Sequence, residues 1–590
     1  MPDVRPHSAF WPRRLPRELH PPKTSLWTNL AISALRYRDK AAFIYCERTV
    51  TYADLLAQAE AVAGWLQHEA GVERGDRVLL FMQNCPQFVA AYYGILRADA
   101  VVVPVNPMNR AEELKHYLRD AQPKAVVLGG ELGAVVAQAN AEVEAESRAS
   151  ALLVAHYADV LQAPPLAVGL GGEAASARAA LLVPTEKLAS LPEVLAARHP
   201  LPEGATDWSQ AVASARRPGP HTAGPDDLAV MPYTSGTTGF PKGCMHTHAT
   251  VMHNTLGAAF WTNGTPEAVV LSVLPMFHVT GMIAGMHAVL YLGSTAVMQP
   301  RWNRDEAAAL IGRHGVSGWT NISTMVVDLL ASPRLPEYDI ASLTTIGGGG
   351  AAMPQAVAQR LQDEFGLQYI EGYGLSETIA PTHTNPPDRA KLQCLGIPVF
   401  GTDARVVDPD TLAERGVDEV GEIVVNGPQV FLGYWRNPDA TRATFVEIDG
   451  KPFFRTADLG RVDAEGYFFI TDRLKRMINA SGFKVWPAEV EALLYRHPAI
   501  QEACVIASKD PYRGETVKAV VVLREAHRGQ VTPEDIIAWA HGEMAAYKAP
   551  RLVELATSLP KSGTGKVMWR KLQEDDAARM ASAAGAVGNS

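Results

Sequence analysis

Two short and almost entirely apolar runs, separated by a helix-like segment, limit the folds open to this chain more than any other feature of its sequence. The runs are Arg77–Met82 and Ala100–Val105, and both are rich in valine and leucine. Apolar runs without polar alternation are typical of strands buried on both faces of a parallel sheet. Gln87–Arg97, between them, carries helix formers. The order strand, helix, strand predicts a βαβ unit within an α/β architecture.

The rest of the chain divides by composition. Its 590 residues suffice for about three or four domain-sized units. An alanine-rich stretch from Gly130 to Arg198 predicts an elaborated or partly mobile surface region, and Arg216–Asp227 predicts a loop. From Gly396 onward, short strands such as Gly421–Asn426 predict a small β-rich unit.

The last quarter of the chain predicts a compact α+β unit, from Asp472 to about Gln573, followed by a frayed end from about Ala577. Its expected helices and strands are Ala488–Tyr495 (helix), Ala503–Ala507 (strand), Ala519–Leu523 (strand) and Pro533–Tyr547 (helix).

Composition excludes several classes of protein. Hydrophobic residues make up 47% and charged residues 20% of the chain, which is typical of an ordinary globular protein. Because 54 basic residues face 63 acidic ones, the net charge is −9, and we expect no nucleic-acid partner. Five widely spaced cysteines without a CxxC pair favour a reducing compartment. The N-terminal residues lack the apolar core of a secretory signal, so we expect a cytoplasmic location.

One uncharged stretch, Ala268–Pro300, is long enough to raise the question of a membrane span. Proline, histidine and several glycines interrupt it, which a spanning helix does not favour. The stretch instead predicts a buried strand at Val269–Leu274, a turn, a buried helix and a second buried strand at Thr295–Met298. We therefore expect no transmembrane segment.

The strongest chemical signal is Tyr233–Gly243, with the sequence YTSGTTGFPKG. Its glycines allow backbone N–H groups to approach an anion closely, its hydroxyls add donors, and Lys242 adds a positive charge. The stretch is not a Walker A loop, because Pro241 stands where that motif requires glycine. Its eleven residues in this order predict a polyphosphate-binding loop.

Two further clusters leave alternatives open. Gly347–Ala352 formally contains G-x-G-x-x-A, and Glu371 follows at a suitable distance, so a dinucleotide-binding fold and a dehydrogenase are a rival interpretation. His246, His248 and His253 follow the phosphate loop; we expect mainly structural roles, with a metal site as the alternative. A third alternative is a nucleotide-binding protein that senses or scaffolds without turnover.

At Tyr233–Gly243 the sequence resembles the adenylate-forming enzymes, which include the AMP-dependent acyl-CoA synthetases. The resemblance covers about residues 24–575 and recurs in order along the chain. Its further motifs are Gly372–Thr378 (GYGLSET), Phe454–Asp458 (FRTAD), Asp472–Lys475 (DRLK), Gly482–Val485 (GFKV) and Pro560–Lys566 (PKSGTGK).

The resemblance implies an α/β fold with a large N-terminal domain of α/β subdomains and a small β-barrel-like unit. A small mobile α+β C-terminal domain would follow, so we expect domains at residues 1–471 and 472–590. Such an enzyme joins a carboxylate to the α-phosphate of ATP, releases pyrophosphate and passes the acyl group to coenzyme A. We expect ATP, Mg²⁺ and coenzyme A as substrates and activating ion, and no tightly bound organic cofactor.

By resemblance, three residues would be catalytic. Lys566 would stabilise charge between the α-phosphate and the substrate carboxylate, Ser376 would donate to the α-phosphate, and Glu377 would hold Mg²⁺. Tyr373 would stack on adenine, and Asp458 and Arg473 would contact the ribose. Besides Tyr373, Asp458 and Arg473, the expected ATP-binding residues are Thr234, Ser235, Gly236, Thr237, Thr238, Gly239, Lys242, Gly348, Gly349 and Gly350.

The C-terminal domain would rotate about Asp472 between the two half-reactions. That rotation would remove Lys566 and bring in the residues beside which pantetheine enters, namely Ser481, Gly482, Phe483 and Lys484.

The expected acyl pocket is apolar and open, and its residues are His278, Val279, Met282 and Gly374. Because each buried methylene is worth about 0.8 kcal/mol, such a pocket favours longer acids, and we expect a medium- to long-chain fatty acid. An aryl or alicyclic acid, or a different acceptor, is the alternative. His278 is either a gate to this pocket or a packed core histidine. The sequence leaves the oligomeric state open.

Two residues depart from the family pattern. Ser376 stands where threonine is usual and retains the hydroxyl. Ala457 stands where glycine is usual, which reduces the freedom of the backbone there. We expect neither change to abolish activity.

Overall fold

The predicted βαβ unit is present and consists of β3 (Arg77–Phe81), α3 (Pro86–Arg97) and β4 (Val101–Pro104). The two strands pair in parallel, as the sequence predicts. This computed structural model describes residues 5–162, 191–234, 241–350, 352–473, 476, 478–480, 483–485, 487–510, 514–561 and 567–587.

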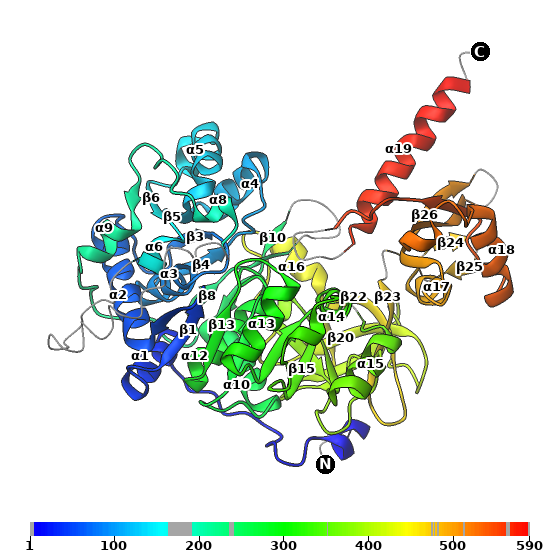
Figure 1. The fold of residues 1–590 in the computed structure, drawn as a ribbon, viewed down its shortest axis with the longest axis horizontal. Helices are drawn as coiled ribbons and strands as arrows, with labels where there is room; N and C mark the ends of the chain where they lie inside the picture. The colour runs from blue at the N-terminus through cyan, green and yellow to red at the C-terminus, as the bar shows by residue number, and fades with distance from the viewer. Residues whose placement is uncertain are drawn as a thin grey trace. The chain divides into compact units, whose positions relative to one another are not determined.

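The chain forms two compact units (Figure 1). Unit 1 comprises Met1–Asp403 and Val425–Phe454, and unit 2 comprises Ala404–Val424 and Arg455–Ser590. Unit 2 thus begins before the predicted hinge at Asp472, and a boundary between moving domains at that residue stays a prediction.

Unit 1 contains two large sheets. The strands of the seven-stranded sheet, in spatial order, are β11 (His246–Thr247), β8 (Leu228–Val230), β4, β3, β5 (Ala125–Gly129), β6 (Ala151–Ala155) and β7 (Thr206–Asp207). Those of the nine-stranded sheet are β18 (Ile397–Pro398), β17 (Ala380–Thr384), β16 (Tyr369–Leu375), β15 (Thr345–Gly349), β14 (Gly318–Asn321), β12 (Val269–Ser272), β13 (Thr295–Met298), β1 (Ala41–Tyr45) and β2 (Arg48–Thr51). Figure 1 shows β1, from the start of the chain, beside the much later β13, with which it pairs in parallel.

Helices cover these sheets. Those of unit 1 are α1 (Trp27–Arg36), α2 (Tyr52–His68), α3, α4 (Ala111–Ala121), α5 (Gly133–Glu142), α6 (Asp159–Gln162), α8 (Glu193–Ala196), α9 (Trp208–Ala213), α10 (His248–Trp261), α11 (Val279–Met282), the π-helical turn η5 (Ile283–His287), α12 (Ala288–Leu292), α13 (Arg304–His314), α14 (Ser323–Leu330), α15 (Gln355–Phe365) and α16 (Pro438–Thr444).

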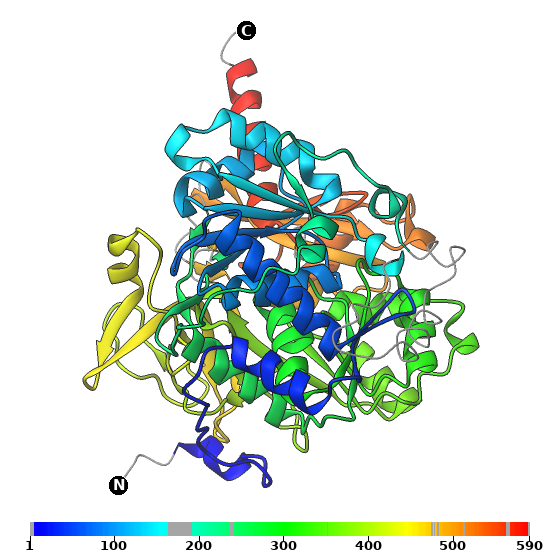
Figure 2. The same ribbon diagram turned by 90° about the vertical axis from the view of Figure 1, so that its left-hand side faces the viewer.

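Burial on both faces explains why β3 lacks polar alternation. Val78 and Leu80 pack into the core formed with α2 and α3, while Leu79 and Phe81 pack into a second core formed with α4 and α5. Figure 2 shows helices on both sides of these blue strands. The first core also contains Met298 of β13, so it joins the two sheets through the helices packed between them.

The alanine-rich region is partly core, so the expectation of a surface region is wrong for strand β6 and for the buried side of α5. Strand β6 pairs in parallel with β5, and its residues Leu153–Ala155 are fully buried. Val136 of α5 is likewise buried. Composition misled here because small alanine side chains also suit close packing. Residues 163–190 lie outside the described part of the chain.

The uncharged stretch folds as predicted into a strand, buried helical segments and a second strand, namely β12, α11, η5, α12 and β13. A Cβ at Gly285 would lie 2.5 Å from the Ser272 hydroxyl, so η5 lies very close to β12. Among the described residues, no helix combines the length and the apolar composition needed to cross a bilayer.

The predicted β-rich region contains β19 (Asp403–Val407), β20 (Gly421–Asn426), β21 (Phe445–Ile448), β22 (Lys451–Val462) and β23 (Phe468–Arg473). Within unit 1, Phe445 of β21 pairs with Phe454 of β22. Within unit 2, Asp458 of β22 pairs with Arg473 of β23.

The predicted C-terminal α+β region is present in unit 2. Its elements are β24 (Ile478–Ala480), β25 (Phe483–Val485), α17 (Pro487–Leu494), β26 (Ile500–Asp510), β27 (Gly514–Leu523), α18 (Pro533–Glu543), β28 (Leu552–Leu555) and α19 (Trp569–Val587). Helix α18 ends four residues earlier than expected because Met544 has an extended backbone.

The end of the chain is helical, so the expectation of fraying from Ala577 is wrong through Val587 (Figure 1). Alanine, the most frequent residue there, is the strongest helix former. Asp576 fixes α19 to the sheet by accepting hydrogen bonds from Ser508 Oγ at 2.7 Å and Lys518 Nζ at 2.6 Å.

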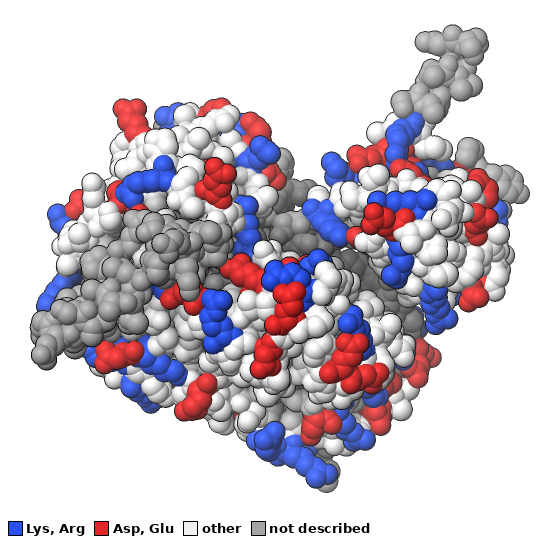
Figure 3. All heavy atoms as spheres, in the orientation of Figure 1, with Lys and Arg blue, Asp and Glu red and all other residues white. Residues whose placement is uncertain are grey.

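Both units carry charge of both signs. Over the described residues on the face drawn in Figure 3, Lys and Arg lie interspersed with Asp and Glu.

Candidate active site

The predicted phosphate loop is carried by a two-stranded hairpin in unit 1. Its strands are β9 (Tyr233–Thr234) and β10 (Lys242–Gly243), which pair antiparallel with Thr234 opposite Lys242. The hairpin therefore brings the first and last residues of the loop together. The expected phosphate-binding residues Ser235, Gly236, Thr237, Thr238 and Gly239 lie outside the described residues.

Contacts with neighbouring elements hold the base of this hairpin. The Tyr233 hydroxyl donates a 2.6 Å hydrogen bond to Asp120 Oδ2, and its ring lies 4.6 Å from that of Tyr117. On the other strand, the N–H of Trp435 donates to the Gly243 carbonyl at 2.8 Å. These bonds tie both strands to the body of unit 1, so the two ends of the loop are fixed.

Ser376 and Glu377 lie in a short 3-10 turn, η7 (Ser376–Thr378), between β16 and β17. The turn leads into Ile379 and Ala380, whose φ angles of 45° and 81° are uncommon for residues other than glycine. The Asn254 side-chain amide supports this conformation by donating to the carbonyls of Thr378 at 3.0 Å and Ile379 at 2.9 Å. Strained backbone that is held in place by surrounding bonds is characteristic of functional sites.

A residue that sequence reasoning missed, Tyr434, joins the hairpin to this turn. Its hydroxyl donates a 2.8 Å hydrogen bond to Glu377 Oε1. The Nζ of Lys242 lies 4.9 Å from the centre of the same ring. Glu377 is 7% exposed, so its carboxylate is held inside the protein. Two predicted residues far apart in sequence thus meet on one tyrosine, which no local pattern signals.

The three clustered histidines bind backbone groups, as the structural interpretation predicts. His246 Nε2 donates to the Ser376 carbonyl at 2.7 Å, His248 Nδ1 accepts from the Leu26 N–H at 3.1 Å, and His253 Nε2 donates to the Phe400 carbonyl at 3.0 Å. Within the described part of the chain, no group of three or more His, Cys, Asp or Glu side chains is arranged to hold a metal ion.

Among the described residues of the glycine run, Gly347–Gly349 do not form the turn that a dinucleotide fingerprint requires. Gly347, Gly348 and Gly349 lie inside β15, which pairs in parallel with β14 and β16. A Cβ at Gly348 would lie 1.8 Å from the Asn321 carbonyl oxygen, so the run serves close approach of strands. Glu371 is 5% exposed, accepts from the Gln393 N–H at 2.9 Å, and has its pKa raised to about 7 by burial. This geometry contradicts the dehydrogenase interpretation.

The remaining ATP-site candidates of unit 1 lie near this run. Gly350 follows β15 with a φ of 86°, a conformation that favours glycine. Tyr373, in β16, is partly buried, and its ring centre lies 5.7 Å from that of His383.

The acyl-pocket candidates differ in burial. Val279 and Met282 of α11 are buried in the core, and the Tyr92 hydroxyl lies 3.4 Å from the Met282 sulfur. His278 precedes α11 and is partly buried. A Cβ at Gly374 would lie 2.1 Å from the Ala380 carbonyl oxygen, so this glycine permits the β16–β17 approach. Their part in binding an acyl chain stays a prediction.

Asp458 lies in unit 2 and is 1% exposed. Its N–H donates to Thr456 Oγ1 at 3.1 Å. The preceding Ala457, which replaces the usual glycine, has a φ of 57°, so it adopts the conformation in which glycine is favoured. The Ala457 N–H donates to Glu422 Oε1 at 3.1 Å.

Several predicted residues cannot be placed in the site. Lys566, Ser481 and Gly482 lie outside the described residues, and only the backbone is described for Asp472, Arg473, Phe483 and Lys484.

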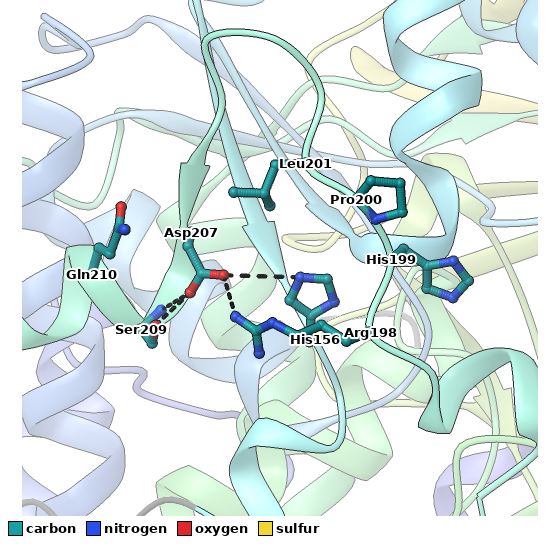
Figure 4. A pocket seen from close by; sticks show the side chains of 8 residues that line it. All are labelled: His156, Arg198, His199, Pro200, Leu201, Asp207, Ser209 and Gln210. Carbon is teal, nitrogen blue, oxygen red and sulfur yellow. Dashed lines mark hydrogen bonds and ion pairs between the residues drawn. The ribbon is translucent and has the colours of Figure 1, made fainter.

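A separate cavity of about 640 Å³ lies on unit 1 and contains none of these residues (Figure 4). His156, which follows β6, and Asp207, the last residue of β7, line it together with Arg198. Arg198 Nη2 lies 2.6 Å from Asp207 Oδ2, and Figure 4 shows the Asp207 carboxylate joined by dashed lines to both the arginine and the His156 imidazole.

Comparison with known proteins identifies the family. The sequence pattern of the AMP-binding enzymes matches residues 30–435, and that of the AMP-binding enzyme C-terminal domain matches residues 489–566. The long-chain-fatty-acid–CoA ligase of Bacillus subtilis (strain 168) is 35% identical over 584 residues, covering 98% of this chain and 99% of that protein. That of Escherichia coli O157:H7 is 31% identical and covers 96% and 97%.

Solved structures agree. The ATP-bound MatB from Rhodopseudomonas palustris superposes with a TM-score of 0.79 at 27% identity, covering 94% of this chain and 99% of that one. The anthranilate CoA ligase AuaEII, at 23% identity, shares the fold with a TM-score of 0.78. The α/β prediction with a large N-terminal and a small C-terminal part is therefore confirmed. This chain belongs to the AMP-binding enzymes, as an adenylate-forming acyl-CoA synthetase.

Proposed function

We propose that the protein is an ATP-dependent ligase that joins medium- to long-chain fatty acids to coenzyme A. The observation that supports this most is the alignment of the long-chain-fatty-acid–CoA ligases of B. subtilis and E. coli with nearly the whole chain. The geometry of unit 1 supports the ATP-dependent part, because Lys242 at the phosphate hairpin and the buried Glu377 meet on Tyr434.

The first half-reaction is attack of the substrate carboxylate oxygen on the α-phosphorus of ATP. A bond forms between that oxygen and phosphorus, the bond to the bridging oxygen breaks, and pyrophosphate leaves. Catalysis of such a transfer depends on positioning the reactants and stabilising their negative charge. Lys242 and the hydroxyl-rich loop suit the departing β- and γ-phosphates, because both supply hydrogen-bond donors and Lys242 supplies positive charge.

Glu377 suits a magnesium ion. Mg²⁺ prefers carboxylate and phosphate oxygens, and Glu377 offers a buried carboxylate held by a hydrogen bond from Tyr434. When bound, the ion would neutralise charge on the phosphates. Ser376, whose carbonyl His246 holds, would present its hydroxyl to the α-phosphate.

Three further residues are expected to bind the nucleoside. Tyr373 would stack on adenine, and the buried Asp458 would accept hydrogen bonds from the ribose hydroxyls. Arg473 would add a contact to the ribose. Lys566 would stabilise the developing charge during adenylation.

In the second half-reaction the coenzyme A thiol, after losing its proton, attacks the acyl carbon. A thioester bond forms and AMP leaves with the electron pair of the acyl–oxygen bond. We propose that rotation at Asp472 replaces Lys566 with the segment Ser481–Lys484 for this step. Both half-reactions then use one active site in turn.

The second candidate substrate is an aryl acid. The feruloyl-CoA synthase of Amycolatopsis sp. is 31% identical over 525 residues, covering 88% of this chain. We favour a fatty acid because the relatives named for fatty acids align over more of the chain and because the pocket candidates are apolar, aromatic or small.

Pyrophosphate and AMP release with ATP, Mg²⁺ and a panel of acids, measured with and without coenzyme A, tests this proposal. Coenzyme A-dependent AMP release that increases with chain length, by about the factor that 0.8 kcal/mol per methylene supplies, supports a fatty-acid ligase. Best turnover on acetate or on hydroxycinnamic acids alone would overturn the choice of acid. Pyrophosphate release without coenzyme A-dependent AMP release would show that coenzyme A is not the acceptor.

A further inference from the structure

We propose that Tyr434 is a positioning residue of the adenylation half-reaction, which orients the Glu377 carboxylate with its hydroxyl and the Lys242 ammonium with its ring. The inference rests on the proposed function, because it assigns Glu377 and Lys242 to Mg·ATP. It adds a residue that lies outside every motif identified in the sequence.

The hydroxyl side of Tyr434 fixes the carboxylate. The 2.8 Å bond to Glu377 Oε1 joins a tyrosine that is 9% exposed to a glutamate that is 7% exposed. An ionised carboxylate only accepts hydrogen bonds, so the phenol O–H is the donor in this bond. A carboxylate offers about four acceptor positions, so a phenol and a cation can bind the same group.

The ring side of Tyr434 holds the ammonium. Lys242 Nζ lies 4.9 Å from the ring centre, within the range of about 6 Å for a cation–π interaction. Lys242 is also fixed through its backbone, because it pairs with Thr234 in the hairpin. The flexible lysine side chain is thereby directed toward the same tyrosine that binds Glu377.

Neighbouring segments hold the backbone of Tyr434, so the position of its side chain is fixed. Tyr434 forms an isolated bridge with Cys244, which follows β10, and its N–H donates to Thr441 Oγ1 at 2.9 Å. Three residues earlier, the Phe431 N–H donates to the Glu377 carbonyl at 2.9 Å. The segment from Phe431 to Tyr434 therefore contacts the hairpin and the η7 turn at the same time.

The Lys242 ammonium and the Glu377 carboxylate must be held at a defined separation to act on one polyphosphate. The ammonium would bind the phosphates directly, whereas the carboxylate would act on them through a cation. A misplacement of about 1 Å in such a site can cost about 100-fold in rate. A rigid aromatic ring between the two groups sets their separation without blocking either of them.

Two variants separate the two contacts. Tyr434→Phe removes the hydroxyl and keeps the ring, and Tyr434→Leu removes both. Hydrogen bonds to charged groups contribute about 1.5–3 kcal/mol, so Tyr434→Phe should lower kcat/KM for acid-dependent pyrophosphate release by about 10- to 100-fold. It should also raise the Mg²⁺ concentration needed for half-maximal rate, and Tyr434→Leu should lower the affinity for ATP further.

The matched control is Tyr157→Phe. The Tyr157 hydroxyl donates a 2.8 Å hydrogen bond to the partly buried Glu131 Oε1 elsewhere in unit 1, so this variant also loses a bond from a buried tyrosine to a carboxylate. It should lower the melting temperature without changing the Mg²⁺ dependence. An equal change in Mg²⁺ dependence from Tyr157→Phe would mean that the Tyr434 effect is general loss of stability.

The decisive measurement is a double-mutant cycle with Glu377→Gln, read by calorimetric binding of ATP with Mg²⁺ and with EDTA as well as by pyrophosphate release. If Tyr434 acts through Glu377, Tyr434→Phe should change Mg·ATP affinity in the wild-type background and have no further effect beside Glu377→Gln. Additive effects, or an unchanged Tyr434→Phe variant, overturn the inference. A wild-type chain that releases no pyrophosphate with any acid overturns the proposed function instead, and the binding cycle then still decides the role of Tyr434.

Discussion

The Nε2 of His246 donates a 2.7 Å hydrogen bond to the main-chain carbonyl of Ser376, 130 residues away in sequence. Because a carbonyl oxygen only accepts hydrogen bonds, Nε2 must carry the proton. His246 has no exposed surface, and burial lowers its pKa to about 4. The imidazole is therefore neutral at physiological pH and holds the serine that we propose for the α-phosphate.

This burial predicts that unit 1 loses stability in mild acid. Burial lowers the pKa of His246 and His248 to about 4, and that of His287 and His383 to about 3, from an ordinary 6.5. Below pH 6.5 the unfolded chain binds protons that the folded chain does not. The contribution of these neutral histidines to the free energy of unfolding is therefore complete above pH 6.5 and is lost toward pH 4. Each histidine adds up to about 1.4 kcal/mol per pH unit.

Urea unfolding followed by tryptophan fluorescence between about pH 5 and pH 7 checks this slope. His287→Phe should reduce the slope by about one proton, whereas His68→Gln, on the exposed end of α2, should leave it unchanged. Stability that stays constant or rises on acidification would contradict the assignment of these histidines as neutral.

Gly348→Ala should destabilise the nine-stranded sheet beside the site. The added methyl group would lie 1.8 Å from the Asn321 carbonyl oxygen, so strands β14 and β15 must separate. Overpacking of this kind costs about 1–3 kcal/mol. Gly318→Ala in neighbouring β14 is the matched control, because its methyl group meets only Val270 Cγ1 at 3.4 Å. Equal free energies of unfolding for the two variants would show that the close approach has no energetic importance.

Ala457→Gly should stabilise unit 2. Ala457 has a φ of 57°, and an L-residue in this region costs about 1–2 kcal/mol relative to its favoured conformations. Glycine relieves that cost but has a more flexible unfolded state, so we expect a net gain of about 1 kcal/mol or less. Ala538→Gly, on the exposed side of α18, should instead lose about 1 kcal/mol. A loss of thermal stability in Ala457→Gly would show that the backbone at Ala457 is not strained.

The sequence was informative wherever side-chain type controls local structure, and silent where distant segments meet. The apolar runs of β3 and β4 predicted a parallel pair because both faces of each strand had to be buried. The run Gly347–Ala352 left a dinucleotide-binding loop open as an alternative, although Gly347–Gly349 lie inside β15, because glycine adds no side chain to the alternation that marks a strand. The contact between Tyr434 and Glu377 depends on the packing of two loops, and neither residue's neighbours in sequence encode it.

Asp472→Pro should slow the second half-reaction more than the first. Asp472 lies near the end of β23, where its backbone pairs with Leu459, and proline there restricts φ and removes an N–H. If the chain turns at this residue, thioester formation from a supplied acyl-adenylate should fall more than pyrophosphate release. Asp472→Ala leaves the backbone free, so its rate of thioester formation should fall less than that of Asp472→Pro. Equal slowing of both steps by proline would argue against a hinge at this position.

Lys566→Ala should show the opposite pattern. We propose that Lys566 stabilises charge only during adenylation, so its loss should leave the thiol's attack on a preformed acyl-adenylate nearly unchanged. Removing one such group typically costs about 100- to 1,000-fold in rate, and we expect pyrophosphate release to fall by that factor. Lys571→Ala is the control, because Lys571 is exposed on α19 and has the same charge. Adenylation at the full rate in Lys566→Ala would remove Lys566 from the catalytic residues, whereas loss of both half-reactions would mean that it serves nucleotide binding throughout the cycle.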